Sequence, residues 1–106
     1  MRLLIEHGTL YADNKFLCYV GAGNGRRDLP VGSYPVATQY SHAHGTDLPN
    51  AMGLGWLGAS DECDVVLGTV RGRDAVVPSQ GALKRLLALV EAAEYRGQTS
   101  TLVVEP

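Results

Sequence analysis

The stretch that decides the fold is PSQGALKRLLALVEAAEYRG at residues 78–97, where apolar side chains recur every three or four positions. That spacing places them on one face of an α-helix. Ser79 is a residue type that caps helix N-termini, and Gly97 is one that ends helices just beyond the last turn. We therefore predict one amphipathic helix from about Ser79 to Arg96. Its predicted apolar stripe consists of Leu83, Leu86, Leu87, Val90 and Ala93.

Short runs of strand-forming residues, separated by turn-forming ones, make up most of the remaining chain. The polar segment 41–50 contains glycine and proline and is predicted to be an exposed loop. The helix must bury its apolar stripe, and about six or seven strands are available to cover it. We therefore predict an α+β, mostly β domain: a small sheet or barrel-like domain with the helix packed on it. A chain of 106 residues is the size of one domain, spanning 1–106. The predicted strands cover residues 3–5, 10–11, 16–20, 33–40, 53–60, 64–68 and 99–105.

Composition and charge exclude several classes of function. Nine basic and eleven acidic residues are spread along the chain without a basic stripe, so a nucleic-acid partner is not expected. No segment is long and apolar enough for a membrane span, and we expect no signal peptide because a charge and then His7-Gly8 interrupt the first apolar run. We expect it to be cytoplasmic as synthesised, unless other machinery exports it into a larger assembly. In that compartment Cys18 and Cys63 are expected to be reduced thiols packed as small hydrophobes, with a disulfide between them as the alternative.

A glycine-rich segment at residues 21–28 is superficially similar to a phosphate-binding loop. A dinucleotide fingerprint needs a helix immediately after the glycines, whereas here Pro30 and Gly32 follow. The segment is therefore predicted to be a flexible loop, and no cofactor is expected.

Histidine and cysteine supply the candidate catalytic chemistry. His42 and His44 would project from one face of a strand, with His7, Asp47 or Cys63 as a third metal ligand, but no spacing places that ligand. We predict no metal site and interpret the histidines as part of a polar loop. Cys63 is a candidate nucleophile, but its acidic neighbours raise a thiol pKa, so a buried or rim thiol is the preferred interpretation.

Arg71 and Arg73 flank a glycine just before Asp74, in a predicted loop that precedes the helix. Two arginines so placed can clamp a carboxylate or phosphate through paired N–H groups. The alternative is solvated loop charges, with Arg73 paired to Asp74 or Glu62.

Taken together, these segments resemble the catalytic domain of L,D-transpeptidases, especially compact relatives carried by phages and bacteria. Residues 29–36, LPVGSYPV, look like the Thr-Pro-x-Gly-x-Tyr-x-Val step of that family. Residues 64–68 fall where the family has an Ile-His strand end, and residues 75–79 where it has Gly-Cys-Ile/Val before a helix. The last strand, at 101–105, matches the closing strand of the family.

The resemblance implies that the chain has the fold of the L,D-transpeptidase family but cannot carry out the family's reaction. The family's cysteine attacks a peptidoglycan stem-peptide carbonyl after a histidine accepts its proton, and here Ala75 and Leu67 occupy those two places. Neither side chain can do that chemistry, and residues 64–106 contain no cysteine or histidine that a shifted alignment could use. The helix N-terminus, which would lower the pKa of a thiol beside it, therefore has no thiol to act on.

The resulting prediction is a non-catalytic module that binds a cell-wall fragment, or a protein partner in a phage- or secretion-type assembly. Its expected binding residues are Arg71, Arg73, Asp74 and Trp56. The alternative is a cysteine-dependent peptidoglycan-processing enzyme with a relocated site, in which Cys63 works with His42 or His44. That alternative requires segment 41–50 to fold over the strand entered at residue 64.

Overall fold

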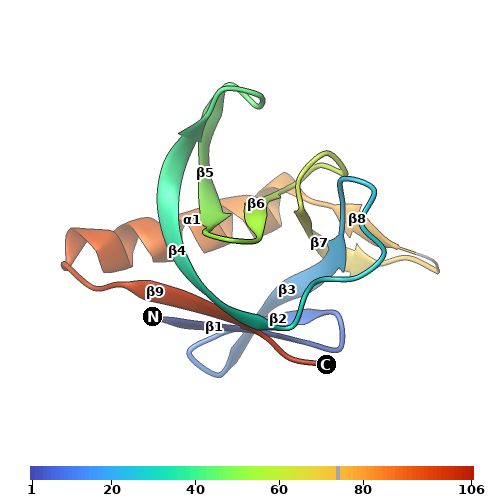
Figure 1. Ribbon diagram of the computed structural model, residues 1–106, viewed down its shortest axis with the longest axis horizontal. Coiled ribbons are helices and arrows are strands. Elements are labelled where there is room, and N and C mark those ends of the chain that lie inside the picture. The colour runs from blue at the N-terminus through green and yellow to red at the C-terminus, as the bar shows by residue number, and fades with distance from the viewer. Residues whose placement is uncertain (74) are drawn as a thin grey trace.

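The computed structural model describes residues 1–73 and 75–106, which form nine strands and the helix α1 (Figure 1). The fold is mostly β, as predicted. The strands are β1 (Arg2–Glu6), β2 (Thr9–Ala12), β3 (Lys15–Ala22), β4 (Gly32–Ser41), β5 (Thr46–Ala51), β6 (Gly55–Gly58), β7 (Val65–Arg71), β8 (Val76–Pro78) and β9 (Ser100–Val104), and α1 is Gln80–Tyr95.

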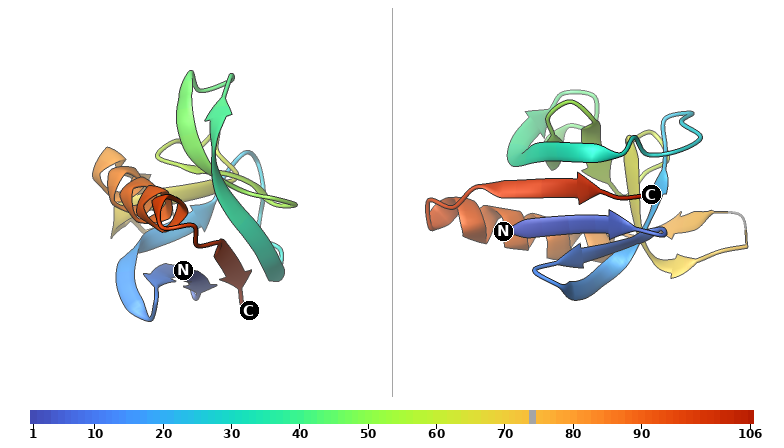
Figure 2. Two further views of the ribbon diagram at one scale, coloured as in Figure 1. Left: turned by 90° about the vertical axis from the view of Figure 1, so that its left-hand side faces the viewer. Right: turned by 60° about the horizontal axis from the view of Figure 1, so that its bottom comes forward.

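Eight of the strands close into a barrel. The sheet order is β3-β2-β1-β9-β4-β5-β6-β7-β8, and β3 also pairs with β7, where Val20 lies opposite Leu67. Closure joins distant parts of the chain, because β9 near the end pairs with β1 in parallel and with β4 in antiparallel fashion. The ninth strand, β8, pairs with the far end of β7, and this hairpin extends beyond the barrel (Figure 2, right).

Helix α1 confirms the sequence prediction in its ends and in most of its stripe. The Ser79 hydroxyl accepts a hydrogen bond from the Ala82 N–H at 3.3 Å, and Gly97 has the positive φ of +72° expected just beyond a helix end. The observed stripe differs from the predicted one in a single member, because Ala82 in the first turn is buried while Leu87 is only half-buried. The helix packs on the barrel against β3, β4, β5, β6, β7 and β9.

The prediction for segment 41–50 is wrong. Only residues 42–45 form a turn, and β5 then begins at Thr46 and pairs with β4 along its length. Polar composition hid this strand, yet Leu48 and Ala51 are 2% and 0% exposed and contribute to the core. Residues 76–78 were likewise not predicted to be a strand. In β5, pairing with β4 outweighs a weak local preference. In β8, Val76 and Val77 are strand-forming residues, but their run is too short to predict a strand without its pairing with β7.

Candidate functional site

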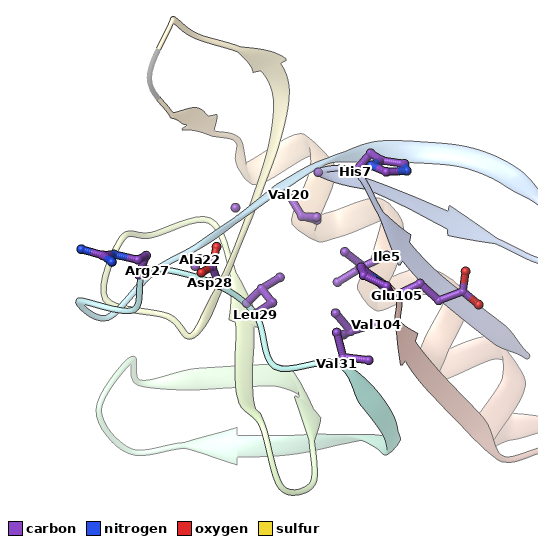
Figure 3. A pocket seen from close by; sticks show the side chains of 13 residues that line it. Ile5, His7, Val20, Ala22, Arg27, Asp28, Leu29, Val31, Val104 and Glu105 are labelled. Atoms are coloured by element: carbon purple, nitrogen blue, oxygen red, sulfur yellow. The ribbon is translucent and has the colours of Figure 1, made fainter.

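A hollow of about 460 Å³, which we call the mouth, lies where β1, β3 and β9 end. Its floor is apolar, since Ile5, Val20 and Val104 are only 2–3% exposed. The loop from residue 23 to residue 31 crosses beside it and adds Leu29 and Val31. In Figure 3 these aliphatic side chains turn toward one another. The polar side chains that the figure shows pointing outward belong to His7, Arg27 and Glu105.

A second hollow, of about 380 Å³, lies between the end of β3 and the β7–β8 hairpin, and we call it the arginine hollow. It is lined by Val20, Gly21, Arg71, Gly72, Arg73, Ala75 and Val76. The Arg71 guanidinium is held in place, because its Nη2 donates to the His7 carbonyl at 3.1 Å and its Cζ lies 5.7 Å from the centre of the Tyr19 ring. This arginine is therefore positioned before any ligand arrives.

A third hollow, of about 270 Å³, is lined in part by Arg26, Arg27 and Ala75. The three hollows share Gly21, so they adjoin one another around that residue. We call the surface they form the Gly21 face. Four arginines line it, whereas its acidic lining residues are Asp28, Asp61 and Glu105 among the residues that the structure describes.

Asp64 fastens the loop that crosses beside the mouth. Its carboxylate accepts hydrogen bonds from the Trp56 backbone N–H at 3.0 Å, from Arg26 Nε at 3.2 Å and from Asn24 Nδ2 at 3.3 Å. Burial alone would raise the pKa of Asp64, but these hydrogen bonds and the charge of Arg26 outweigh it and hold the pKa below the ordinary 3.8. Arg26 also donates to the Leu54 carbonyl at 3.1 Å, so the loop is tied to β6 and its neighbouring turn.

A thiol, an imidazole and a hydroxyl form a short chain away from the Gly21 face. Cys63 Sγ lies 3.6 Å from His44 Nε2, and His44 Nδ1 lies 2.8 Å from Ser41 Oγ. The β4–β5 turn thus reaches Cys63, two residues before β7 begins, as the relocated-site alternative requires. Gly58 makes room for this thiol, since a Cβ at that position would lie 2.6 Å from Cys63 Sγ.

Burial opposes reactivity at Cys63. The residue is 1% exposed and is not among the residues that line the three hollows. Burial, followed by the negative charges of Asp64 and Glu62, raises the pKa of Cys63 above its ordinary 9.0. Burial also raises the pKa of Cys18 to about 11. Both cysteines are free, which confirms the prediction of two packed thiols.

The predicted binding residues do not all come together. Arg71 and Arg73 line the same hollow, and Asp74 lies outside the described residues. Trp56 is half-buried against the core and is absent from the lining of the three hollows. Among residues 1–73 and 75–106, the ion pair that an arginine or lysine forms is Arg26 with Asp64, so Arg73 is not paired with Glu62.

The remaining predicted positions are also separated. His42 does not share a site with His44, because its ring packs edge-on against Tyr40 at 4.9 Å. No group of three or more histidine, cysteine, aspartate or glutamate side chains able to hold a metal was found within the described chain. Leu67 is fully buried in the core, whereas Ala75 is exposed in the lining of two hollows.

The sequence alone does not indicate the residues that complete the Gly21 face or the cluster of Cys63, His44 and Ser41. Arg27 and the aliphatic floor of the mouth come from segments far apart in the chain, and only barrel closure brings them together. The sequence predicts a loop at Ser41, and no local signal indicates that its hydroxyl contacts the His44 ring. The one available signal was the pair of adjacent arginines at 26 and 27 in a glycine-rich loop.

Comparisons with known protein families, with curated proteins and with solved structures give no match. No helix in the described part of the chain has the length and apolar character needed to cross a membrane.

Proposed function

We propose that this chain is a non-catalytic, L,D-transpeptidase-like module that binds a carboxylate-bearing peptide of the cell wall on its Gly21 face. The observation that carries this proposal is the position of Arg71 and Arg73 in one hollow that adjoins an apolar mouth. Planar guanidinium groups bind carboxylates through paired N–H groups, and they are the preferred side chains for that purpose.

The lining of the arginine hollow also supports binding over chemistry. The position that the resemblance assigns to the nucleophile is Ala75, an exposed residue of this lining with no reactive group. The position that it assigns to the base is Leu67, whose side chain is fully buried. The arginine hollow contains two arginines that can bind a carboxylate but no nucleophile at the expected position, so it can hold a peptide without cleaving it.

The first test is retention on purified peptidoglycan. We expect the wild-type chain to be retained and the Arg71→Ala/Arg73→Ala variant to lose about tenfold or more in affinity, because a hydrogen bond to a charged group is worth about 1.5–3 kcal/mol. The matched control is Lys84→Ala/Arg96→Ala, which removes two exposed positive charges from α1 and its cap, away from the three hollows.

No retention of the wild-type chain would remove the cell-wall ligand. Equal losses in the two double variants would show that net charge, rather than the Gly21 face, drives retention. A peptide segment of a protein partner in a phage- or secretion-type assembly carries the same carboxylate chemistry. Capture of such a segment without retention on peptidoglycan would move the proposal to that partner.

A second candidate function is favoured by the contact between Cys63 and His44. In a cysteine-dependent peptidoglycan-processing enzyme, His44 Nε2 would accept the thiol proton and Ser41 would orient the ring, while the sulfur attacked a peptide carbonyl. The C–N bond of the peptide would then break, and the amine would leave with the proton from His44. The distances allow this proton transfer. The closed environment of Cys63 and the acidic groups beside it oppose the attack that must follow.

Thiol labelling separates the two candidates. With an alkylating probe at pH 7, we expect Cys63 to react about tenfold or more slowly than free cysteine, because the thiolate is the reactive form and a raised pKa makes it scarce. The extent of modification at each cysteine is read by peptide mass mapping. Fast labelling of Cys63 that slows in His44→Ala would favour the enzyme. A slow rate that does not fall further in His44→Ala would favour the binding module.

A further inference from the structure

We infer that the Gly21 face recognises the free C-terminal carboxylate of a peptide whose last residue has an aliphatic side chain. This inference rests on the proposed function and deepens it, because it names the part of the ligand that is bound. The carboxylate would enter the arginine hollow while the terminal side chain enters the mouth.

The mouth supplies the aliphatic half of the site. Its floor of Ile5, Val20 and Val104 offers no polar side-chain atom to a ligand, and Leu29 and Val31 extend the same surface along the loop (Figure 3). The side chains of His7, Arg27 and Glu105 lie at its rim with their polar ends directed outward. An aliphatic side chain that binds in the mouth would be transferred from water to an apolar surface, which is favourable.

Arg71 supplies the fixed donor for the carboxylate. Its guanidinium is bonded to the His7 carbonyl and lies over the Tyr19 ring, so little of its freedom is lost when a ligand binds. Gly8 is required for this arrangement, because a Cβ at residue 8 would meet Arg71 Nη2. Arg73 lines the same hollow and adds a second positive charge.

The distribution of charge decides which hollow takes the carboxylate. The rim of the mouth contains the carboxyl groups of Asp28 and Glu105 beside Arg27 and His7, and the third hollow has Asp61 beside its arginines. The arginine hollow has no acidic side chain among the described residues of its lining. Among the described residues of the Gly21 face, those of the arginine hollow therefore complement an anion best.

The closeness of the two hollows favours a chain terminus over an acidic side chain within a peptide. Val20 and Gly21 line both hollows, so the two binding places share a wall. At a peptide C-terminus the carboxylate and the side chain leave the same Cα, which is the shortest link between an anion and an aliphatic group. An internal aspartate or glutamate would need a neighbouring residue to supply the aliphatic group.

The test compares three fluorescently labelled tetrapeptides by anisotropy: Gly-Ala-Ala-Val with a free carboxylate, the same peptide as its C-terminal amide, and Gly-Ala-Ala-Gly with a free carboxylate. We expect the amide to bind about tenfold or more weakly, since it loses a charge-assisted contact. We also expect the glycine-ended peptide to bind about tenfold more weakly, because the mouth stays empty.

Protein variants check that the discrimination comes from this site. In Arg71→Gln the preference for carboxylate over amide should fall to about twofold or less, whereas Lys84→Gln should keep it. Equal binding of acid and amide by the wild-type chain, or no saturable binding of the acid, would overturn the inference. Peptidoglycan retention combined with either result would leave the proposed function standing. Acid-selective binding without peptidoglycan retention would keep the inference and remove the cell-wall ligand.

Discussion

Leu86→Ala is expected to lower the free energy of unfolding by about 2–5 kcal/mol, a large share of the stability of a domain of this size. Leu86 is 0% exposed and belongs to the same buried cluster as the barrel residues Leu67 and Leu102. Truncating it removes apolar contacts and leaves a cavity at the interface between α1 and the barrel. Urea denaturation followed by circular dichroism measures the difference.

The matched control is Leu89→Ala, which makes the same chemical change on the same helix. Leu89 is 38% exposed and lies outside the buried cluster, so we expect a cost of less than about 1 kcal/mol. If the two variants were equally stable, α1 would not be packed on the barrel through Leu86. That result would contradict the arrangement in Figure 1.

Asp64→Ala is expected to cost about 2–4 kcal/mol at neutral pH, because it removes the acceptor of three hydrogen bonds, one of them from an arginine. The Trp56 N–H and the side chains of Asn24 and Arg26 all lose this partner. The loop beside the mouth is then less firmly held, so ligand binding should weaken along with stability. Asp61→Ala, an exposed neighbour, serves as the control and is expected to change stability by less than about 0.5 kcal/mol.

The same variant should also change how stability depends on pH. The pKa of Asp64 is lower in the folded state than its ordinary 3.8, so the folded chain holds this proton less tightly than the unfolded chain. The contribution of Asp64 is therefore complete above about pH 5 and is lost as pH falls through the folded pKa. We expect the gap between wild type and Asp64→Ala to narrow below about pH 4. A gap that stayed constant from pH 7 to pH 3 would contradict the ionised hydrogen-bonded carboxylate.

The elements that sequence reasoning located correctly are those with a strong local signal. The stripe from Leu83 to Ala93, together with Ser79 and Gly97, was sufficient for α1, because a helix satisfies its backbone within one segment. β5 was missed for the opposite reason. Its backbone pairs with β4, and a strand that contains Asp47, Pro49 and Asn50 has no strong local preference of its own.

The candidate sites follow the same division. Arg71 and Arg73 are predicted to bind an anion because they lie two positions apart in the sequence. The apolar mouth beside them is assembled from three strand ends and a loop, which no local pattern indicates. The pairing of Cys63 with His44 was named as an alternative from residue type, and the structure brings the two within 3.6 Å. Their burial, which opposes catalysis, was visible only after the chain had been folded.

The sequence by itself predicts one amphipathic helix, a mostly β domain, two free thiols and a short list of side chains able to bind a ligand or act as nucleophile and base. These depend on periodicity, residue type and charge, which are properties of neighbouring positions. Closure of the barrel, the mouth and the fixed guanidinium of Arg71 depend on contacts between residues far apart in the chain, such as Val20 with Leu67 and Arg71 with His7. No local pattern encodes such contacts, because their free energy is realised only when the whole sheet has closed.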